Sequence, residues 1–427
     1  MNATTVTLLS LSIALFAGLM LSRLAKKVHL PAVTAYLIAG VLIGPFMLGA
    51  LFDTDGIGIT SNQLEGFSII SSVALGFIAF SMGNEFRVEQ LKKIGKKATI
   101  IGIGQALITT IVVDSFLIGL HFIIPEHFSL SAAIVLGAVA TATAPAATLM
   151  VVKQYKAKGP LTELLLPVVA LDDAVGLVVF AISFGVAKSI SLGNVDVLSI
   201  VLEPLLEVVL SLGLGFVMGM LFERSERFFH SRSKRMAVSV TFVLLTVALS
   251  NIHFEIGKVG IGFSPLLSCM MLGTVFCNIC DFSEELMDRA DRWMAPILIL
   301  FFVISGAELE LSVFSDWIII LIGVVYIISR CLGKYFGAFL SAKAVGCDKK
   351  TQKFLGITLW PQAGVALGMA LQATQLGADG DIVRNITLFA VLIYEIVGPF
   401  LTKVSLTCTG DINPEGKKSS RGKIGHH

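Results

Sequence analysis

Two adjacent aspartates, Asp172 and Asp173, lie about ten residues into a long apolar stretch of the sequence. Ten helical residues rise ~15 Å, so a helix crossing a ~30 Å hydrocarbon core would hold both carboxyl groups near the bilayer midplane. An aspartate there costs ~2.5 to 3.5 kcal/mol to insert, which makes a purely structural role for both a poor explanation. A carboxyl group held away from water can carry either a proton or a cation. Asp172 and Asp173 therefore predict a site where Na⁺ or another small cation competes with protons.

Oxygen-bearing groups that would complete such a site occur in two interrupted apolar stretches. Thr141 and Thr143 precede Pro145 in one of them, and Pro361 precedes Gln362 in the other. A proline inside a helix removes a backbone hydrogen bond and clashes with the preceding turn. Unwound backbone at membrane depth is tolerated where it is buried in protein or lines a watery cavity, and its freed carbonyls can coordinate ions. We expect Thr141 and Thr143 to supply oxygen ligands, with Gln362 as an accessory group.

Basic residues in a later apolar stretch provide partners for the carboxyl groups. Arg330 lies near the middle of that stretch, and Lys334 follows one helical turn later. A buried guanidinium without a carboxylate is costly, so we expect Arg330 to form an ion pair with one aspartate. Lys334 is expected to extend toward the inner interface, with a site role as the alternative. Asp114, in an earlier apolar stretch, is expected either to pair elsewhere or to line the cavity.

The elements that must position these residues are membrane-spanning helices. Of 427 residues, 55% are hydrophobic and 15% are charged, whereas soluble chains carry about 25% charged residues. Apolar runs long enough to span the bilayer predict an all-α polytopic membrane protein with about thirteen transmembrane helices. Their approximate extents are 4–22, 30–48, 66–82, 98–122, 130–151, 162–186, 199–222, 236–251, 262–280, 293–309, 316–340, 354–375 and 385–405.

The loops between these runs predict the orientation. Of 32 basic residues, 27 fall in alternate connections and only Lys188, Lys258 and Arg384 fall in the others. Because Lys and Arg concentrate in cytoplasmic loops, we expect an outside N-terminus and a cytoplasmic C-terminus. The net charge of +2 gives no reason to expect a nucleic-acid partner. No phosphate-binding Gly-x4-Gly-Lys loop is present, so the sequence does not support an ATP-driven pump or another enzyme, and no cofactor is expected.

A weak internal match indicates how the helices are arranged. Phe80-Ser-Met-Gly83-Asn-Glu85 ends the third run, and Val303-Ile-Ser-Gly306-Ala-Glu308 ends the tenth. Seven runs separate the two, an odd number, so the matched helices run in opposite directions. The two interrupted runs, the fifth and the twelfth, have the same offset. Together these matches predict two inverted-topology repeats with two crossed broken helices, although chance similarity could explain the first match alone.

The chain resembles the cation/proton antiporters, in particular the bacterial sodium/proton antiporters with an Asp-Asp motif. The resemblance rests on Leu30-Pro31 through Gly44-Pro45, on the Gly83-Asn-Glu85 ending, on the threonine-rich interruption, on Leu171-Asp172-Asp173 and on Arg330. It implies a homodimer in the bacterial inner membrane, a core that moves against a dimerisation domain, and alternating access to one site. We assign residues 1–405 to one transporter domain, with core helices at about 66–186 and 293–375, and residues 406–427 to a cytoplasmic tail.

The same resemblance implies roles for the charged residues. Asp173 matches the main ion carrier, and Asp172 matches the aspartate that pairs with a basic residue. Electrogenic members have a lysine at that basic position, where Arg330 is expected here. Because arginine does not release its proton, this match favours exchange of one proton per cation.

Other functions stay open at this point. A related architecture serves sodium-coupled organic-anion symporters of the bile acid type, and a potassium/proton efflux system would use similar residues. A membrane receptor that transports nothing is a third alternative. The residues present do not choose among Na⁺, Li⁺ and K⁺, because selectivity depends on cavity size and on the number of ligands.

Overall fold

The structure is a computed structural model of the chain. It describes residues 3–27, 32–47, 59–144, 148, 151–152, 155–191, 197–252, 254–256, 259–309 and 317–412. Pro145, Glu85's side chain and most of the predicted tail lie outside the described part.

The described residues are almost entirely helical. In chain order the α-helices are α1 (Ala3–Lys27), α2 (Ala32–Ile43), α4 (Ser61–Gly83), α5 (Val88–Ile123), α6 (Leu130–Val139), α8 (Pro160–Ser191), α9 (Val197–Glu226), α10 (Arg232–Ser250), α11 (Pro265–Ile279), α12 (Ser283–Ala307), α13 (Trp317–Ala344), α14 (Lys349–Thr358), α15 (Gly364–Ala373) and α16 (Ala378–Thr409). Short 3₁₀ turns, η1 (Asn84–Phe86) and η3 (Thr374–Leu376), extend two of them. A small antiparallel hairpin, β1 (Phe254–Ile256) and β2 (Val259–Ile261), follows α10 and was not predicted.

The predicted spans correspond to these helices one to one. Nine described helices are long and apolar enough to cross a membrane, and α2, α6 and α11 are shorter apolar helices. The twelfth predicted span is the broken pair of α14 and α15. In the fifth, regular helix ends at Val139, just before the predicted interruption. The last helix continues to Thr409, four residues beyond the predicted end at 405. The all-α polytopic architecture is confirmed.

Helix packing follows the predicted repeat. If each helix is matched to the one seven spans later, α2 matches α11, α4 matches α12, α6 matches α14, and α8 matches α16. The observed pairs obey this match: α4 packs on α11 while α12 packs on α2, and α6 packs on α8 while α14 packs on α16. The α5–α13 pair is its own counterpart, whereas α9, which packs on α11, has no counterpart under this match. The chain therefore contains two inverted repeats.

Glycines at two matched contacts explain how these pairs approach so closely. A side chain on Gly40 of α2 would lie 1.9 Å from the Val303 carbonyl oxygen of α12. One on Gly273 of α11 would lie 2.1 Å from the Phe80 carbonyl oxygen of α4. Small residues allow membrane helices to pack backbone to backbone, where dispersion contacts rather than water exclusion hold them together. The Gly83 and Gly306 endings of the sequence repeat lie at these two contacts.

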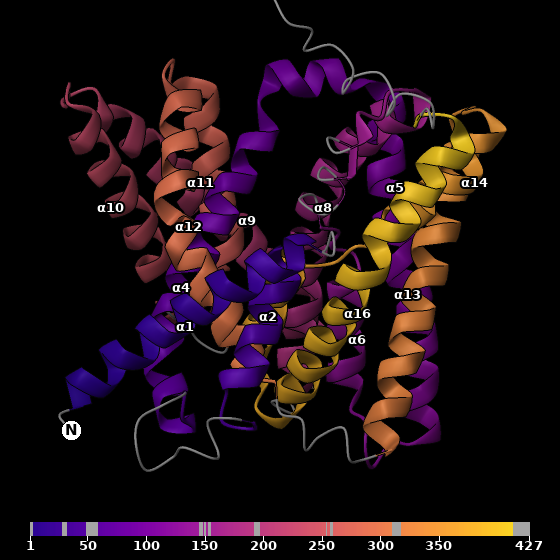
Figure 1. Ribbon diagram of the computed structural model, residues 1–427, viewed down its shortest axis with the longest axis horizontal. Coiled ribbons are helices and arrows are strands. Elements are labelled where there is room, and N and C mark those ends of the chain that lie inside the picture. The colour runs from indigo at the N-terminus through magenta and orange to yellow at the C-terminus, as the bar shows by residue number, and fades with distance from the viewer. Residues whose placement is uncertain are drawn as a thin grey trace, which may run out of the picture.

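The helices form two packing groups, which Figure 1 places on opposite sides of the molecule. One contains α1, α2, α4 and α9–α12, and the other, the site group, contains α5, α6, α8 and α13–α16. Helices α4 and α12 pack mainly on α11 and α2, whereas α16 packs on α14 and α15. The moving core predicted at 66–186 and 293–375 stays a prediction, because these contacts show which helices pack together and not which part moves.

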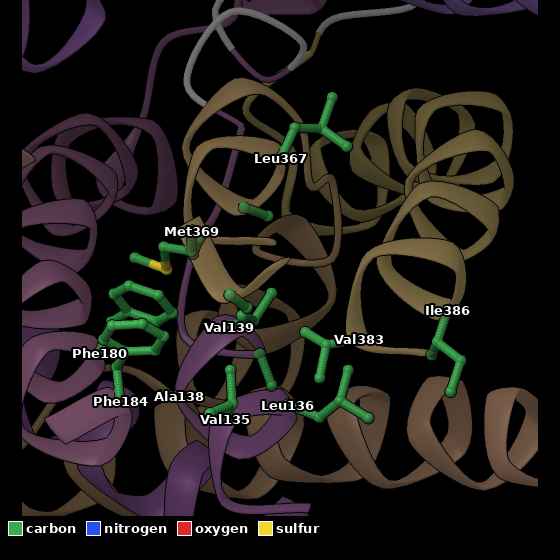
Figure 2. Close-up of a cluster of buried hydrophobic side chains, with 14 of the residues drawn as sticks. Val135, Leu136, Ala138, Val139, Phe180, Phe184, Leu367, Met369, Val383 and Ile386 are labelled. Carbon is green, nitrogen blue, oxygen red and sulfur yellow. The ribbon is translucent and has the colours of Figure 1, made fainter. Parts of the chain in front are cut away.

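The core of the site group surrounds the short helix α6. Eight of its ten residues are buried, as expected of a helix that is apolar on every side. Figure 2 shows Val135 and Val139 of α6 near Phe180 of α8, Met369 of α15 and Val383 of α16. Because α6 is enclosed by protein, its broken end lies inside the site group rather than against lipid. Apolar residues on other helices, such as Phe16, Ile111 and Ile328, remain exposed, as lipid-facing side chains are.

Candidate functional site

Helices α5 and α13 build one wall of the site through a close backbone contact. A side chain on Gly337 of α13 would lie 2.9 Å from the Gln105 carbonyl oxygen, and one on Gly333 would lie 3.0 Å from Thr109 Cα. Lys334 lies next to Gly333 and is completely buried, as are Arg330 and Gln105. The contact leaves no route to water for these side chains, so their polar groups must find partners inside the protein.

Asp172 and Lys334 form the central ion pair. Lys334 Nζ lies 2.5 Å from Asp172 Oδ2, and both side chains are fully buried. Lys334 also donates to Thr143 Oγ1 at 2.9 Å, to Gln105 Oε1 at 3.2 Å and to the Thr141 carbonyl oxygen. Asp172 accepts hydrogen bonds from Thr143 Oγ1 and Gln105 Nε2. A buried pair of this kind is stable only when further hydrogen bonds satisfy its remaining groups, as they do here.

Asp173 lies beside this pair and faces the first interruption. The backbone N–H of Thr143 donates to Asp173 Oδ1 at 3.3 Å, and the side chain is 3% exposed. Adjacent residues of a helix point ~100° apart, which is why Asp173 does not share the lysine of Asp172. The two carboxyl groups therefore have different environments: one is neutralised by a cation, and the other receives a backbone dipole at the unwound segment.

The two interruptions meet each other at this point. The Ala144 N–H donates to the Pro361 carbonyl oxygen at 2.8 Å, and Gln362 Nε2 donates to the Val139 carbonyl oxygen at 2.9 Å. Residues 141–144 and 359–363 are both non-helical. The predicted meeting of two broken helices is confirmed by these contacts.

Arg330 binds backbone carbonyls of both interruptions. Its guanidinium donates to the carbonyl oxygens of Ala140 at 3.0 Å, Ala142 at 2.6 Å and Trp360 at 2.8 Å. It also lies over the Tyr394 ring, 4.5 Å from the centroid. Each carbonyl belongs to the carboxyl-terminal end of a half-helix, where the backbone dipole is negative. Arg330 therefore neutralises two helix ends and joins them, using the fork of donors that only arginine provides.

This arrangement corrects the predicted pairing. We expected Arg330 to pair with an aspartate and Lys334 to extend to the interface, but Lys334 forms the ion pair and Arg330 forms none in the described part of the chain. The prediction was wrong because it matched charge to charge. Freed backbone carbonyls are also partners for a buried cation, and a sequence does not show how many of them one side chain can reach.

The remaining predicted residues are only partly brought together. Thr143 connects the first interruption to Asp172 and Lys334 through its hydroxyl. Thr141 contributes its carbonyl oxygen and turns its hydroxyl back to the Ala138 carbonyl at 2.7 Å. Gln362 links the interruptions and donates to Tyr326 Oη at 3.2 Å, without a hydrogen bond to either aspartate among described residues. Asp114 lies about 13 Å along α5 from Gln105, against Gly137 of α6, and is not part of this cluster.

Gln105 is the site residue that sequence reasoning missed. It touches both members of the ion pair and is fully buried. An amide inside an apolar run was the available signal, since polar groups in membrane helices need partners. It was passed over because an uncharged side chain costs less to insert than an aspartate.

The fold and site together define a multi-pass membrane transporter whose charged groups meet where two broken helices join. The model of the family described as "sodium/hydrogen exchanger, transmembrane" matches residues 11–408, so the chain belongs to that family.

Known proteins resemble the chain over nearly its whole length. The Na(+)/H(+) antiporter NhaS4 of Synechocystis is 23% identical over 416 residues, covering 95% of this chain and 98% of the relative. The K(+)/H(+) antiporter subunit KhtU of Bacillus subtilis is 23% identical over 395 residues, covering 90% of each chain. The structure of the sodium proton antiporter MjNhaP1 of Methanocaldococcus jannaschii superposes with a TM-score of 0.72 at 20% identity, covering 95% of this chain and 98% of that one, which shows the shared fold.

Proposed function

We propose that this chain exchanges a monovalent cation for protons at Asp173, by alternating access across a bacterial inner membrane. The observation that carries the proposal is the environment of Asp173. It is a buried carboxyl group at an unwound segment, beside an aspartate that already has its own lysine. Its carboxyl group lies against unwound backbone, so an incoming cation or proton would meet a negative group and oxygen ligands at the same place.

Competition between the two ions follows from this environment. A carboxylate away from water is costly unless it holds a proton or a cation, so Asp173 would carry one or the other during each reorientation. Oxygen atoms of Thr143 and of the unwound backbone are the ligand type that hard monovalent cations prefer. Exchange results if the protein reorients only when Asp173 is occupied.

The ion pair also changes the expected stoichiometry. The prediction of one proton per cation depended on an arginine at the basic position, and the residue paired with Asp172 is Lys334. Lysine can release its proton when its carboxylate partner is engaged elsewhere, whereas arginine cannot. We therefore propose that the Asp172–Lys334 pair takes part in proton transport, so that more than one proton is exchanged for each cation.

The packing groups suggest which part moves. We propose that the site group, α5, α6, α8 and α13–α16, reorients against the other group, which would form the interface of a homodimer. All residues of the ion pair and both interruptions belong to the site group, so rigid movement would preserve their contacts. The bias of basic residues supports an outside N-terminus and a cytoplasmic C-terminus.

The names of the relatives differ in the transported cation, sodium for one and potassium for the other. We propose sodium as the cation, and the transport assay below compares it with lithium and potassium. A sodium-coupled organic-anion symporter would need an organic solute for sodium uptake, whereas an antiporter releases protons when the cation alone is added.

The test is proton flux in proteoliposomes, monitored by a pH-sensitive dye after addition of Na⁺, Li⁺ or K⁺. Asp173→Asn should abolish cation-driven proton movement while the protein elutes as wild type from a sizing column. Asp114→Asn is the matched control, because Asp114 is another intramembrane aspartate outside the cluster. Wild-type exchange in the Asp173 variant would overturn the proposal.

A further inference from the structure

The carboxyl group of Glu395 also lies deep in the membrane part of the chain, outside the cluster around Asp172 and Lys334. Glu395 is near the middle of the 32-residue helix α16 and is 1% exposed. Its Oε1 atom has no hydrogen-bond partner among the described residues. Leaving a buried charged oxygen unpaired costs several kcal/mol, so the neutral, protonated form is favoured at this position.

The repeat places Glu395 at the counterpart of Asp173. Helix α16 matches α8, and the local sequences match as well: Asp173-Ala174-Val175-Gly176 corresponds to Glu395-Ile396-Val397-Gly398. The glycine makes the same kind of contact in both. A side chain on Gly176 would lie 2.5 Å from Thr141 Oγ1 in the first interruption, and one on Gly398 would lie 2.7 Å from Pro361 Cγ in the second.

The preceding residues also contact one helix. Asp172 precedes Asp173 and pairs with Lys334 of α13, whereas Tyr394 precedes Glu395 and contacts Arg330, one turn away on α13. Both pairs of residues thus send one side chain to a basic residue of α13, a likeness that is separate from the repeat, which relates α13 to α5. The side chains of Asp173 and Glu395 then point about 100° away around the axis of their helices.

Pro399 leaves the backbone carbonyl of Glu395 without its helical hydrogen bond. Pro399 lies inside α16 and has no N–H to donate to the carbonyl of Glu395, four residues earlier. The residue therefore combines a carboxyl oxygen without a partner and a backbone carbonyl that lacks its helical donor.

Charged groups on the elements packed against α16 do not neutralise Glu395. Helix α13 presents Arg330, which is engaged with three carbonyls and the Tyr394 ring, and Lys334, which is paired with Asp172. Helix α8 holds Asp172 and Asp173 at the first interruption. The other charged residues of α8 and α13, which are Glu163, Lys188 and Lys343, lie toward helix ends. Helix α14 has Lys349, Lys350 and Lys353 in its first half, and α2, α6 and α15 have no charged residue. Titratable but uncharged neighbours are Tyr326, Cys331 and Tyr394.

We infer that Glu395 is a second proton-binding site of the transporter, the repeat-related counterpart of Asp173. It binds and releases one proton in each transport cycle, as the site group carries α16 from one side of the membrane to the other. The oxygen atoms of Thr143 and of the unwound backbone are the groups that would also accept a cation at the first interruption, and we assign a proton alone to Glu395. The inference rests on the proposed exchange of cations for protons.

The test is the number of protons moved per cation, obtained from the reversal potential of proteoliposomes with imposed cation and proton gradients. Glu395→Gln should retain cation-driven exchange but move one proton fewer per cycle than wild type. Glu395→Asp should restore the wild-type number, because it keeps a carboxyl group. The matched control is Glu207→Gln, which removes a half-buried glutamate from α9, outside the site group. An unchanged proton number in Glu395→Gln would overturn the inference.

A second measurement on the wild-type protein keeps the inference testable if Glu395→Gln does not fold. Dicyclohexylcarbodiimide reacts only with protonated carboxyl groups, and mass spectrometry locates the adduct. Glu395 should be labelled when the reaction is run at low pH, and the extent of labelling should fall in reactions run at higher pH. No label at Glu395 at any pH would overturn the inference. Absence of cation-driven proton flux in the wild type would instead overturn the proposed exchange, and the labelling result would still report on Glu395.

Discussion

Matched helices in the two halves of the repeat carry different chemical groups. In the first half, α8 brings two aspartates to the interruption after α6, where Lys334, Thr143 and a backbone N–H satisfy them. In the second half, α16 brings Tyr394 and Glu395 to the interruption after α14, where Glu395 has an oxygen without a partner. Inverted repeats place equivalent positions in equivalent geometry, and the side chains then decide what each position binds. We propose that the first half binds an ion with several oxygen ligands and that the second binds a proton.

The largest loss of stability should appear when the Asp172–Lys334 ion pair is broken. Asp172→Asn leaves Lys334 buried without a counter-charge, which should destabilise the protein by about 3 to 5 kcal/mol. Thermal unfolding in detergent would measure this as a lower melting temperature. The double variant Asp172→Asn with Lys334→Met should recover much of the loss, because neither charge remains. Equal melting temperatures of wild type and Asp172→Asn would contradict the assigned pair.

Substitution of Arg330 should cause the next largest loss of stability, because its side chain joins the two halves of the repeat. Arg330→Lys keeps the charge but replaces the planar fork by a single ammonium on a shorter side chain, so it should not reach all three carbonyls of Ala140, Ala142 and Trp360. We expect a loss of about 3 kcal/mol, since a hydrogen bond to a charged group contributes about 1.5 to 3 kcal/mol. Lys343→Gln, an exposed position of the same helix, is the control. If arginine and lysine gave equal stability, the carbonyl contacts would not matter.

Matched glycine variants sharpen the comparison directly. A methyl group on Gly176 would displace Thr141, and one on Gly398 would displace Pro361. Gly176→Ala should weaken cation affinity about 10-fold, or about 1.4 kcal/mol, because it shifts the half that holds the cation. Gly398→Ala should affect cation affinity less and proton number more. The cation concentration giving half-maximal exchange distinguishes the two, and a larger effect from Gly398→Ala would reverse the assignment.

Removing a threonine hydroxyl should have a smaller effect on stability, and the effect should differ between the two halves. Thr143→Val removes a hydroxyl that contacts both Lys334 and Asp172, so it should cost about 1 kcal/mol and slow exchange. Thr387→Val removes a buried hydroxyl of α16 that has no hydrogen-bond partner among the described residues. Its loss should be neutral or slightly stabilising. Melting temperatures and exchange rates measured side by side would check both, and equal losses would count against the contacts.

The smallest effect concerns how each broken helix begins. Ser129 Oγ accepts from the Ala132 N–H at 3.0 Å at the start of α6, and Asp348 Oδ2 accepts from the Thr351 N–H at 3.0 Å at the start of α14. Replacing either cap by alanine should cost about 1 kcal/mol. Only the Asp348 cap should depend on pH.

The sign of that pH dependence follows from the cap. The hydrogen bonds from Thr351 lower the pKa of Asp348 below its ordinary value of 3.8. The stabilisation is therefore present above pH 3.8 and is lost as the pH falls through the pKa of the folded protein. Melting temperatures of Asp348→Asn and wild type should differ in their acid dependence, and parallel curves would show that the charge contributes nothing.

The spans and the repeat were predictable because each depends on a property that residues carry individually. Apolar length predicts a membrane helix, proline predicts an interruption, and an aspartate in an apolar run indicates a functional group. Asp172, Asp173 and Thr143 were located in this way. Sequence order does not show which helices pack beside the site, and the contacts of α16 became visible only in the fold.

What only the tertiary structure decided is which polar group meets which. Lys334 and Arg330 lie one turn apart on α13, and both were equally able to pair with an aspartate on sequence alone. The close contact of α5 with α13 and the meeting of the interruptions gave the lysine the carboxylate and the arginine the backbone carbonyls. Gln105 and Glu395 acquired their importance in the same way. A buried polar residue is costly wherever it lies, but its partner depends on distances that only packing sets.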